Sequence, residues 1–330
     1  MSEKNIAITM RDPAGIEPEI ILKTIKAYSS ENVNILVIGT LEVMEDAKRI
    51  IGLNIPINII KDIEKSNFNK NAINLLDLNN ISSEEYEYGQ IQKICGQASA
   101  EYIYKGIELA QDNLIKAVVT APIHKEAINL AQVPQAGHTE ILADNFKVKD
   151  YAMMLVEGNF RVVHVSTHVS LREACNRVKK ARVFKVIKLA NETMEKLGIE
   201  NPTIAVAGLN PHAGEHGLFG SEEKEEIRPA VEQALSEGLE VEGPIPPDTV
   251  FAKARTGQYD IVVAMYHDQG HIPMKTVGFE YDQEQEEWLS VSGVNVTLGL
   301  PIIRTSVDHG VAFDIAGKNQ ASPDSMKEAV

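Results

Sequence analysis

The chain has 330 residues, of which 44% are hydrophobic and 24% are charged, a composition typical of globular proteins and sufficient for two ordinary domains. Its formal net charge of −15 argues against nucleic acid and anionic membranes as partners, and no apolar run approaches the roughly 20 residues that a membrane span needs. The first residues, MSEKNIAITM, lack the apolar segment of a signal peptide, so we expect a cytoplasmic protein. An anionic substrate would need a local cluster of cations to hold it against this net charge.

Short apolar runs alternate with helical patterns along the chain, which predicts a parallel α/β architecture. In chain order we predict a strand at Ile6–Thr9, a helix at Pro18–Ala27, a strand at Asn34–Gly39, a helix at Gln97–Asn113, a strand at Ala117–Thr120, a hairpin of Tyr151–Val156 and Arg161–Val165, a long helix at Val178–Leu197, and strands at Thr203–Ala207 and Ile261–Met265. Phe279–Val294 is predicted to form two short strands around an acidic turn, as an exposed hairpin. No G-x-G-x-x-G follows a strand and no P-loop is present, which argues against a conventional Rossmann or ATPase site.

Three histidines follow three of the predicted strands where the apolar run ends. His168 follows RVVHVST, His212 lies in AVAGLNPHAGEHG and His267 lies in IVVAMYHDQGH. Because the carboxyl ends of parallel strands meet at one edge of a sheet, three imidazoles there could form a catalytic site for a divalent metal. Each histidine taken singly fits a structural role as well, but the repeated placement favours the metal site. His164, inside its strand, is expected to be structural, and His271 to support a metal ligand.

Three groups are candidates for acid–base catalysis. Asp268 adjoins His267, Asp248 lies in GPIPPDTVF, and Lys125 follows His124 in TAPIHKEA. A carboxylate close to a metal ion can orient a ligand or accept a proton. Asp248 has an alternative role as the N-cap of the helix that begins with TVFAKA, and the two roles can coexist.

Several residues could bind an anionic group. His138 and Thr139 in GHTEILA precede a helical run, whose free N–H groups would form a phosphate site; simple capping by the threonine is the alternative. Lys275, Asn295 and Arg304 add donors. Arg304 in LPIIRTS is a candidate for a planar clamp on a carboxylate or phosphate, whereas a surface salt bridge is the alternative for Lys275.

The segment DHGVAFDIAGKNQASP, residues 308–323, is on its residues alone a tight loop. It resembles the adenosine-binding loop of the isocitrate/isopropylmalate dehydrogenase fold. That resemblance implies contacts to the cofactor from His309, Gly310, Asp314, Ile315 and Asn319. NADP-preferring relatives carry Lys-Tyr in place of Asp314 and Ile315. Since an aspartate would repel a 2′-phosphate, the resemblance points to NAD as the cofactor.

The other motifs narrow the resemblance to the 4-hydroxythreonine-4-phosphate dehydrogenase family, over nearly the whole chain. They occur in the family's order: MRDPAGIEPEI, VTAPIHKEAI, GHTEILA, STHVSLREA, GLNPHAGEHGLFGSEE, GPIPPDTVF, YHDQGHIPMK and GVNVTLGLPIIRTSVDHG. The resemblance implies two α/β/α subdomains with a cleft between them. Residues 1–137 and 290–330 would form the nucleotide side, and residues 138–289 the subdomain for metal, substrate and dimerisation.

The resemblance also implies the residues of the site. His168, His212 and His267 match the metal-binding histidines, and His138, Thr139, Lys275, Asn295 and Arg304 match the substrate-binding positions. One divalent ion is implied, for which zinc, cobalt, manganese and magnesium are candidates. The family forms homodimers whose active sites lie at the dimer interface, with metal ligands from both subunits.

Two departures from the family pattern stand out. Its first motif is similar to G-D-P-A-G-I-G-P-E, and the outer glycines are here replaced by Arg11 and Glu17. Glycine permits an unusual φ, so two charged side chains call the loop geometry and the cofactor affinity into question; an exposed ion pair between them would contribute only ~0–1 kcal/mol. The second departure is the Phe279–Val294 hairpin, which resembles the branch of the family that acts on phosphorylated sugar acids.

The expected reaction is NAD-linked oxidation of the C3 hydroxyl of 4-phospho-D-threonate or 4-phospho-D-erythronate, followed by decarboxylation to dihydroxyacetone phosphate. One alternative is the 4-hydroxythreonine-4-phosphate dehydrogenase of pyridoxal phosphate biosynthesis. A second is a binding protein on the same scaffold, supported only by Arg11 and Glu17. A third is a metal-dependent phosphate acyltransferase without NAD, against which the DIAGK run argues.

Overall fold

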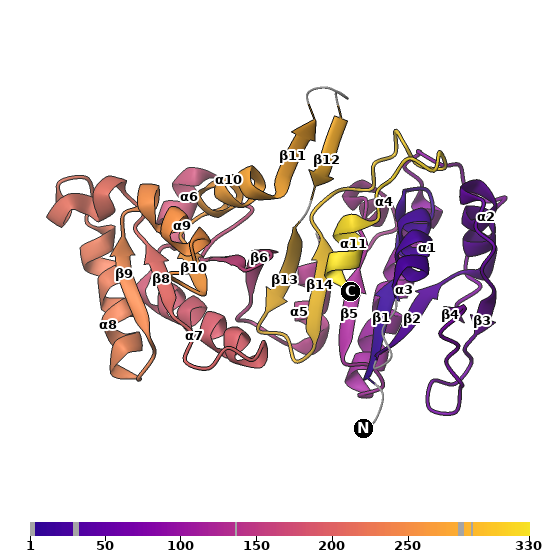
Figure 1. The fold of residues 1–330 in the computed structure, drawn as a ribbon, viewed down its shortest axis with the longest axis horizontal. Coiled ribbons are helices and arrows are strands. Elements are labelled where there is room, and N and C mark those ends of the chain that lie inside the picture. The colour runs from indigo at the N-terminus through magenta and orange to yellow at the C-terminus, as the bar shows by residue number, and fades with distance from the viewer. Residues whose placement is uncertain (1–3, 29–32, 136, 283–286, 292) are drawn as a thin grey trace. The chain divides into compact units, whose positions relative to one another are not determined.

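The computed structural model describes residues 4–28, 33–135, 137–282, 287–291 and 293–330 (Figure 1). The contacts divide the chain into two compact units. Unit 1 comprises Met1–Lys147 and Leu300–Val330, and unit 2 comprises Val148–Gly299. Among the described residues, no helix combines the length and the apolar character that crossing a membrane requires.

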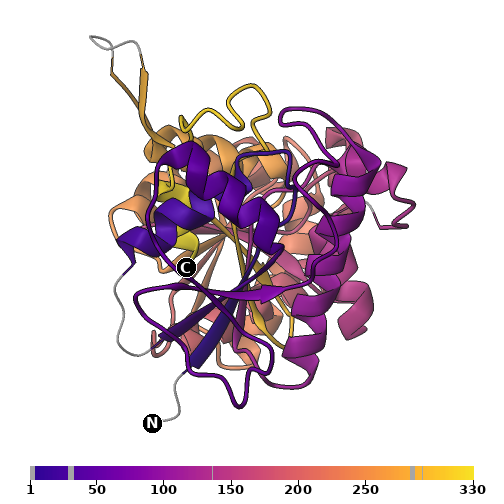
Figure 2. The same cartoon turned by 90° about the vertical axis from the view of Figure 1, so that its right-hand side faces the viewer.

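Unit 1 is built on a parallel sheet in the order β3-β4-β2-β1-β5-β14. Its strands are β1 (Lys4–Thr9), β2 (Val33–Gly39), β3 (Ile57–Ile59), β4 (Ile73–Asp77), β5 (Ala117–Thr120) and β14 (Ile303–Val307). Its helices are α1 (Glu17–Ala27), α2 (Leu41–Ile51), α3 (Lys93–Gln111), α4 (Lys125–Leu130), α5 (His138–Phe146) and α11 (Asp324–Ala329). Figure 2 shows helices on both faces of this sheet, which explains why its central strands are continuous apolar runs.

Unit 2 has a mixed sheet in the order β13-β6-β7-β10-β8-β9. Its strands are β6 (Ala152–Glu157), β7 (Phe160–His164), β8 (Ile204–Ala207), β9 (Val241–Ile245), β10 (Ile261–Ala264) and β13 (Val294–Leu298). Strands β7, β10, β8 and β9 are parallel, whereas β6 is antiparallel to both β7 and β13. The helical segments are α6 (Leu171–Arg177), α7 (Lys180–Lys196), η1 (Pro211–Gly217), η2 (Glu223–Ile227), α8 (Arg228–Ser236), α9 (Pro247–Arg255) and α10 (His267–Gly278).

Alternating side chains of the unit 2 strands fill two separate cores. Val163 and Val263 pack with α7 and α8 on one face of the sheet, while Val162 and Val262 pack with α9 and α10 on the other. Burial of each such side chain stabilises the fold by roughly 1.5–3 kcal/mol. Helices on both faces therefore fix the sheet from which the histidine-bearing loops emerge.

Most of the predicted elements are present, with small changes at their ends. The long helix begins at Lys180 instead of Val178, because residues 178 and 179 form the bend between α6 and α7. The hairpin predicted at Phe279–Val294 is confirmed as an antiparallel pair of strands, β11 (Phe279–Asp282) and β12 (Glu287–Val291). Residues 283–286, for which the acidic turn is predicted, lie outside the described residues.

The division of the chain differs by about ten residues from the boundaries expected from the sequence, which lay after residues 137 and 289. Helix α5 belongs to unit 1, because it packs against α3. Strand β13 belongs to unit 2, because it pairs with β6 along its whole length. In both divisions one unit consists of two separate stretches of chain.

Candidate active site

The three strands that precede the predicted metal histidines are neighbours in one sheet. Strand β10 pairs in parallel with β7 on one side and with β8 on the other. His267 follows β10, His168 follows β7 and His212 follows β8, each a few residues beyond the carboxyl end. The three histidines therefore leave the same edge of the unit 2 sheet, where open α/β sheets bind their ligands.

His168 and His267 lie side by side at this edge, with ring centroids 5.7 Å apart. His267 Nδ1 is 2.7 Å from the Asp268 carboxylate, which fixes the ring orientation and leaves Nε2 available for a metal ion. The ring of His271 stacks on that of His267 at 3.6 Å and its Nδ1 contacts the His267 carbonyl oxygen. Both Asp268 and His271 thus support the position of His267.

His164 differs from these histidines because it is fully buried. Its Nδ1 is 3.1 Å from the Met153 carbonyl oxygen, and burial, aided by the charge of His271, lowers its pKa to about 3. A neutral ring inside the sheet fits the structural role predicted for it.

His212 lies in the turn η1, whose backbone is unusual. Residues 212–216 all have positive φ, from 41° to 81°, although only Gly214 among them is a glycine. Each non-glycine residue in this region costs roughly 1–2 kcal/mol. Such strain persists only where the surroundings enforce it, and it concentrates at functional sites.

The buried carboxylate of Glu223 enforces this turn from the chain that follows it. Glu223 Oε1 accepts from the backbone N–H groups of Leu209 and Asn210 at 2.8 and 2.7 Å. Its Oε2 accepts from Asn210 Nδ2 at 3.0 Å, and Glu222 accepts from the same amide nitrogen. Glu223, with a smaller contribution from Glu222, thereby holds the segment that carries His212.

Replacement of Glu223 by alanine is therefore expected to weaken metal binding without removing a metal ligand. Two backbone donors would lose their acceptor, and the strained turn would relax. Supporting residues of this kind typically change metal affinity 10–100-fold. Titration of the metal-free protein with Zn²⁺ or Mn²⁺ measures the effect, with the exposed Glu232→Ala on α8 as the control. Unchanged affinity in Glu223→Ala would contradict the role.

The three predicted metal histidines do not form one group in this chain. Within the described ranges, no three His, Cys, Asp or Glu side chains are grouped closely enough to hold a metal ion. His168 and His267 form a pair, whereas the ring of His212 contacts Phe219, with centroids 6.1 Å apart. The residues fit a divalent ion in their chemistry, since His168 and His212 are exposed and His267 is already oriented through Nδ1.

The two other candidates for proton transfer lie at helix starts. Asp248 is exposed in the first turn of α9, and α9 packs against η1. The alternative N-cap role is wrong, because the cap position is Pro246 and no side chain caps this helix. Lys125 is exposed at the start of α4 in unit 1, next to His124, whose ring stacks on Phe313 at 5.0 Å.

The predicted anion-binding residues of unit 1 are partly or fully buried. His138 is the first residue of α5, with Gly137 at the cap position, and its Nε2 is buried without a hydrogen bond. Capping by Thr139 is wrong, because no side chain caps α5 and the threonine lies inside its first turn. Arg304 on β14 is buried, and its Nε and Nη2 donate to Thr120 Oγ1 at 3.1 and 2.8 Å.

The remaining two substrate candidates belong to unit 2. Lys275 lies on α10, with its Nζ 5.2 Å from the centroid of the Phe279 ring. Asn295 lies on β13 opposite Leu155, and its Oδ1 is buried without a hydrogen bond. A buried amide oxygen without a partner fits a residue that accepts a hydrogen bond from a ligand.

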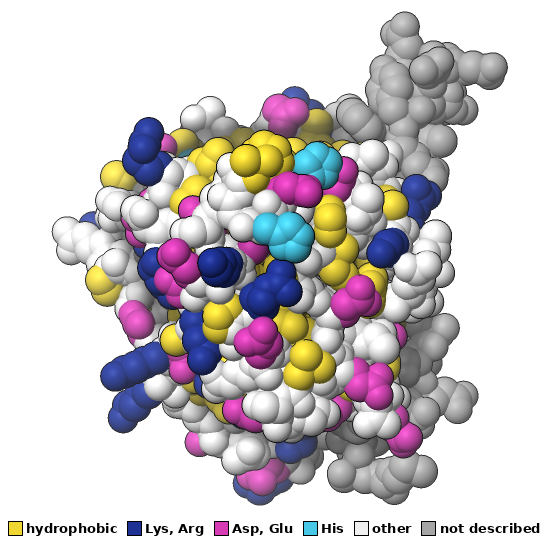
Figure 3. Space-filling model, turned by 90° about the vertical axis from the view of Figure 1, so that its left-hand side faces the viewer, with side chains coloured by type: hydrophobic (Ala, Val, Ile, Leu, Met, Phe, Trp, Pro, Cys, Tyr) yellow, Lys and Arg dark blue, Asp and Glu magenta, His cyan; other side chains and the backbone are white. Residues whose placement is uncertain are grey.

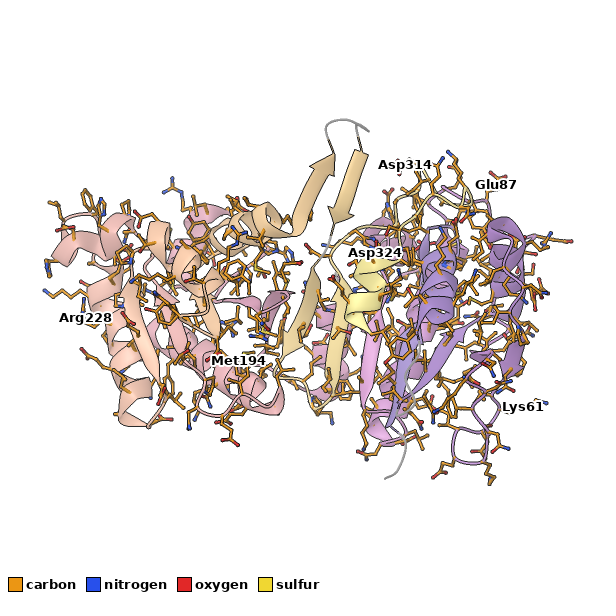
Figure 4. All side chains as sticks on the ribbon, viewed as in Figure 1. Lys61, Glu87, Met194, Arg228, Asp314 and Asp324 are labelled. Carbon is orange, nitrogen blue, oxygen red and sulfur yellow. The ribbon has the colours of Figure 1, made fainter. Side chains whose placement is uncertain are left out.

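The predicted nucleotide loop, residues 308–323, is fixed by hydrogen bonds to helix α1. The N–H of Gly317 donates to the Glu19 carboxylate at 2.7 Å, and Lys23 Nζ donates to the carbonyl oxygens of Asn319 and Ala321. Asp314 is exposed and lies at the same end of unit 1 as Glu87 (Figure 4). The other predicted contacts, His309 and Gly310, precede this turn, while Ile315 is part of it. The loop is therefore ordered by hydrogen bonds and exposes the acidic side chain of Asp314.

Sequence reasoning missed where Arg11 and Glu17 lie: Arg11 is in the loop between β1 and α1, and Glu17 is the first residue of α1. Both side chains are fully buried, contrary to an exposed ion pair. Arg11 has a φ of 70°, the left-handed conformation that glycine adopts freely. Burial, followed by the charge of nearby Asp12, raises the pKa of Glu17 well above its ordinary value. The only sequence signal was the departure from the glycine pattern.

This chain is similar to known proteins over nearly its whole length. The family model described as pyridoxal phosphate biosynthetic protein PdxA matches residues 31–330. A protein of Oceanobacillus iheyensis named "Putative D-threonate 4-phosphate dehydrogenase" is 47% identical over 334 residues, which cover 100% of this chain and 97% of the relative.

Solved structures give the same result. A 4-hydroxythreonine-4-phosphate dehydrogenase from Burkholderia phymatum is 43% identical, with a TM-score of 0.85 and coverage of 100% of this chain and 97% of the other. One from Klebsiella pneumoniae is 40% identical, with a TM-score of 0.86 and coverage of 99% and 97%. The chain therefore belongs to the family of the pyridoxal phosphate biosynthetic protein PdxA, and it is a dehydrogenase of that family.

Proposed function

We propose that this dehydrogenase is metal-dependent and NAD-linked, and that it oxidises the C3 hydroxyl of 4-phospho-D-threonate or 4-phospho-D-erythronate. Loss of CO2 from the resulting 3-oxo acid would give dihydroxyacetone phosphate. The observation that carries the proposal is the placement of His168, His212 and His267 after three adjacent parallel strands. The name of the Oceanobacillus iheyensis relative supports the substrate class.

The chain's own residues would divide the work as follows. His168, His212 and His267 would hold a divalent ion, with Asp268 and His271 positioning His267. Bound there, such an ion supplies positive charge for a developing alkoxide and for the enolate that remains after CO2 leaves. The loop of residues 308–323 would hold NAD, which supplies the hydride acceptor.

Proton removal from C3 has two candidate bases. Asp248 stands on the helix that packs against η1, and Lys125 begins α4 beside the nucleotide loop. Asp268 is already engaged with His267, so we assign it to positioning instead. His138, Thr139 and Arg304 in unit 1, with Lys275 and Asn295 in unit 2, would bind the phosphate and the carboxylate.

We further propose that the working enzyme is a homodimer in which the metal ligands come from both subunits. Large apolar side chains are exposed within seven residues after each histidine: Leu171 after His168, Leu218 and Phe219 after His212, and Ile272 after His267. Exposed apolar groups beside polar ones are typical of an interface between proteins. Figure 3 shows histidine side chains on one such mixed surface.

The second candidate function is that of a 4-hydroxythreonine-4-phosphate dehydrogenase, and it is favoured by the titles of the similar solved structures. The two substrates differ at C2, which carries a hydroxyl group in the sugar acids and an amino group in the amino acid. The binding protein and the phosphate acyltransferase are set aside, since the chain belongs to a dehydrogenase family.

The test is NADH formation with Mn²⁺ or Zn²⁺ on 4-phospho-D-threonate, 4-phospho-D-erythronate and 4-phosphohydroxy-L-threonine in parallel. We expect turnover of at least one of the two sugar acids, with a kcat/KM at least about tenfold above that of the amino acid, equivalent to about 1.4 kcal/mol. Turnover of the amino acid alone would establish the second candidate instead. Absence of NADH from every substrate would overturn both.

A further inference from the structure

Arg11 and Arg304 of unit 1 are each hydrogen-bonded to a threonine, and the two threonines are paired on neighbouring strands. Thr9 ends β1 and Thr120 ends β5, and these two residues are partners in the parallel register. Arg11 Nε donates to Thr9 Oγ1 at 3.2 Å, and Arg304 donates twice to Thr120 Oγ1. The anchors thus bring two guanidinium groups to one place at the carboxyl edge of the sheet.

The two charges are close enough to act on each other. Burial and then the charge of Arg304 lower the pKa of Arg11, while burial lowers the pKa of Arg304 to about 10. A guanidinium group stays protonated in proteins, so both arginines carry a positive charge. Two adjacent buried cations repel each other, so the arrangement is favourable only when an anion lies between or beside them.

The charge of Glu17, at the start of α1, acts on Arg11, but no hydrogen bond joins the two side chains. The Nη1 and Nη2 atoms of Arg11 are buried and make no hydrogen bond, and both carboxylate oxygens of Glu17 are equally without a partner. No ion pair within 4 Å joins Arg11 to Glu17 or Asp12 in the described part of the chain. Glu140 is the acidic residue whose charge acts on Arg304. The buried Nη1 and Nη2 groups of Arg11 can therefore donate hydrogen bonds to an acceptor on a ligand.

We propose that Arg11 is a substrate-binding residue whose guanidinium acts with that of Arg304 to bind the phosphate group of the substrate. A phosphate carries nearly two negative charges and three acceptor oxygens, which match two cationic forks, whereas a carboxylate is matched by one. The inference rests on the proposed function for the identity of the phosphorylated substrate. The site itself is defined by Arg11, Arg304 and their threonine anchors.

The backbone conformation of Arg11 allows a substitution that tests phosphate binding without destabilising the fold. Because Arg11 has a φ of 70°, the substitution Arg11→Gly removes both the strain and a buried unpaired charge. The variant is therefore expected to fold and to have a Tm no lower than that of the wild type. A residue that merely shaped the loop would then be dispensable, whereas a phosphate-binding residue would not.

The experiment is calorimetric titration of the full-length protein and of Arg11→Gly with inorganic phosphate, together with kcat and KM for 4-phospho-D-threonate. We expect Arg11→Gly to weaken phosphate binding and to raise KM by about 10- to 100-fold, with a smaller change in kcat, because two charge-assisted hydrogen bonds are lost. Arg11→Lys keeps the charge without the fork and should recover part of the phosphate affinity. Arg49→Gln, which removes an exposed arginine of unit 1, should change neither quantity.

Phosphate affinity and KM that stay within about twofold in Arg11→Gly would overturn the inference. The inference would also be overturned if Arg11→Gly lost affinity for unphosphorylated D-threonate but still bound phosphate normally. Arg11 would then bind the carboxylate of the substrate instead of its phosphate. Failure of the proposed function is a separate result. If the wild type oxidises no phosphorylated acid yet loses phosphate binding in Arg11→Gly, the dehydrogenase substrate is wrong and the two-arginine phosphate site stands.

Discussion

Replacing His212 with alanine is expected to abolish turnover while leaving the fold intact. The side chain is exposed on the strained turn η1 and makes no contact that the core needs, so its removal should not change the circular dichroism spectrum. Its loss removes one of three proposed metal ligands. Bound metal per subunit, measured by atomic emission after dialysis, should fall together with the rate of NADH formation.

His216 provides a matched control for this experiment. It lies in the same turn, is also exposed, and has a φ of 58° compared with 53° for His212, so the two alanine substitutions perturb the backbone alike. His216→Ala should retain metal and activity. More than about a tenth of the wild-type rate in a metal-loaded His212→Ala sample would count against a ligand role for His212.

The double substitution Asp314→Lys with Ile315→Tyr is expected to shift the enzyme from NAD toward NADP. Asp314 is exposed on the loop of residues 308–323, so a lysine there is free to meet a 2′-phosphate that the aspartate would repel. The ratio of kcat/KM for the two cofactors should change on the order of 100-fold, equivalent to about 3 kcal/mol. Initial rates with each cofactor at saturating substrate give the ratio.

The control for the cofactor switch is Glu87→Lys. Glu87 is exposed at the same end of unit 1 as Asp314 (Figure 4), so this variant adds a positive charge nearby without altering the loop. A similar shift in both proteins would mean that general electrostatics set the preference. No shift in the double variant would mean that the loop of residues 308–323 does not bind the adenosine ribose.

The strands and the edge of the sheet where the histidines gather could be predicted from the sequence because they depend on local patterns. Apolar runs bounded by polar loops indicated β7, β8 and β10, and the rule that parallel strands bind ligands at their carboxyl ends placed His168 and His267 together. The family resemblance then supplied the roles of single residues, which no periodicity contains.

Other features depend on contacts between distant residues and carry no local signal. In PHAGEH only Gly214 favours the left-handed region, and the four other residues with positive φ adopt it because Glu223 accepts hydrogen bonds from the chain ahead of the turn. The burial of Arg11 likewise follows from its anchor on Thr9 and from the packing of the loop, whereas a charged loop residue would normally be expected in water. Short elements such as β3 and α4 have too few residues for a period to be recognised.

The order of strands in unit 2 has a consequence for the time at which a metal ion can be bound. Strand β10 lies between β7 and β8, although it follows both in the chain. His267 therefore reaches His168 only after a strand made late in synthesis has inserted between two made earlier, which is a slow, non-local step. Capture of the proposed metal ion by these histidines should follow folding of the sheet rather than direct it, so a nascent chain that ends before β10 is expected to hold no ion at this edge.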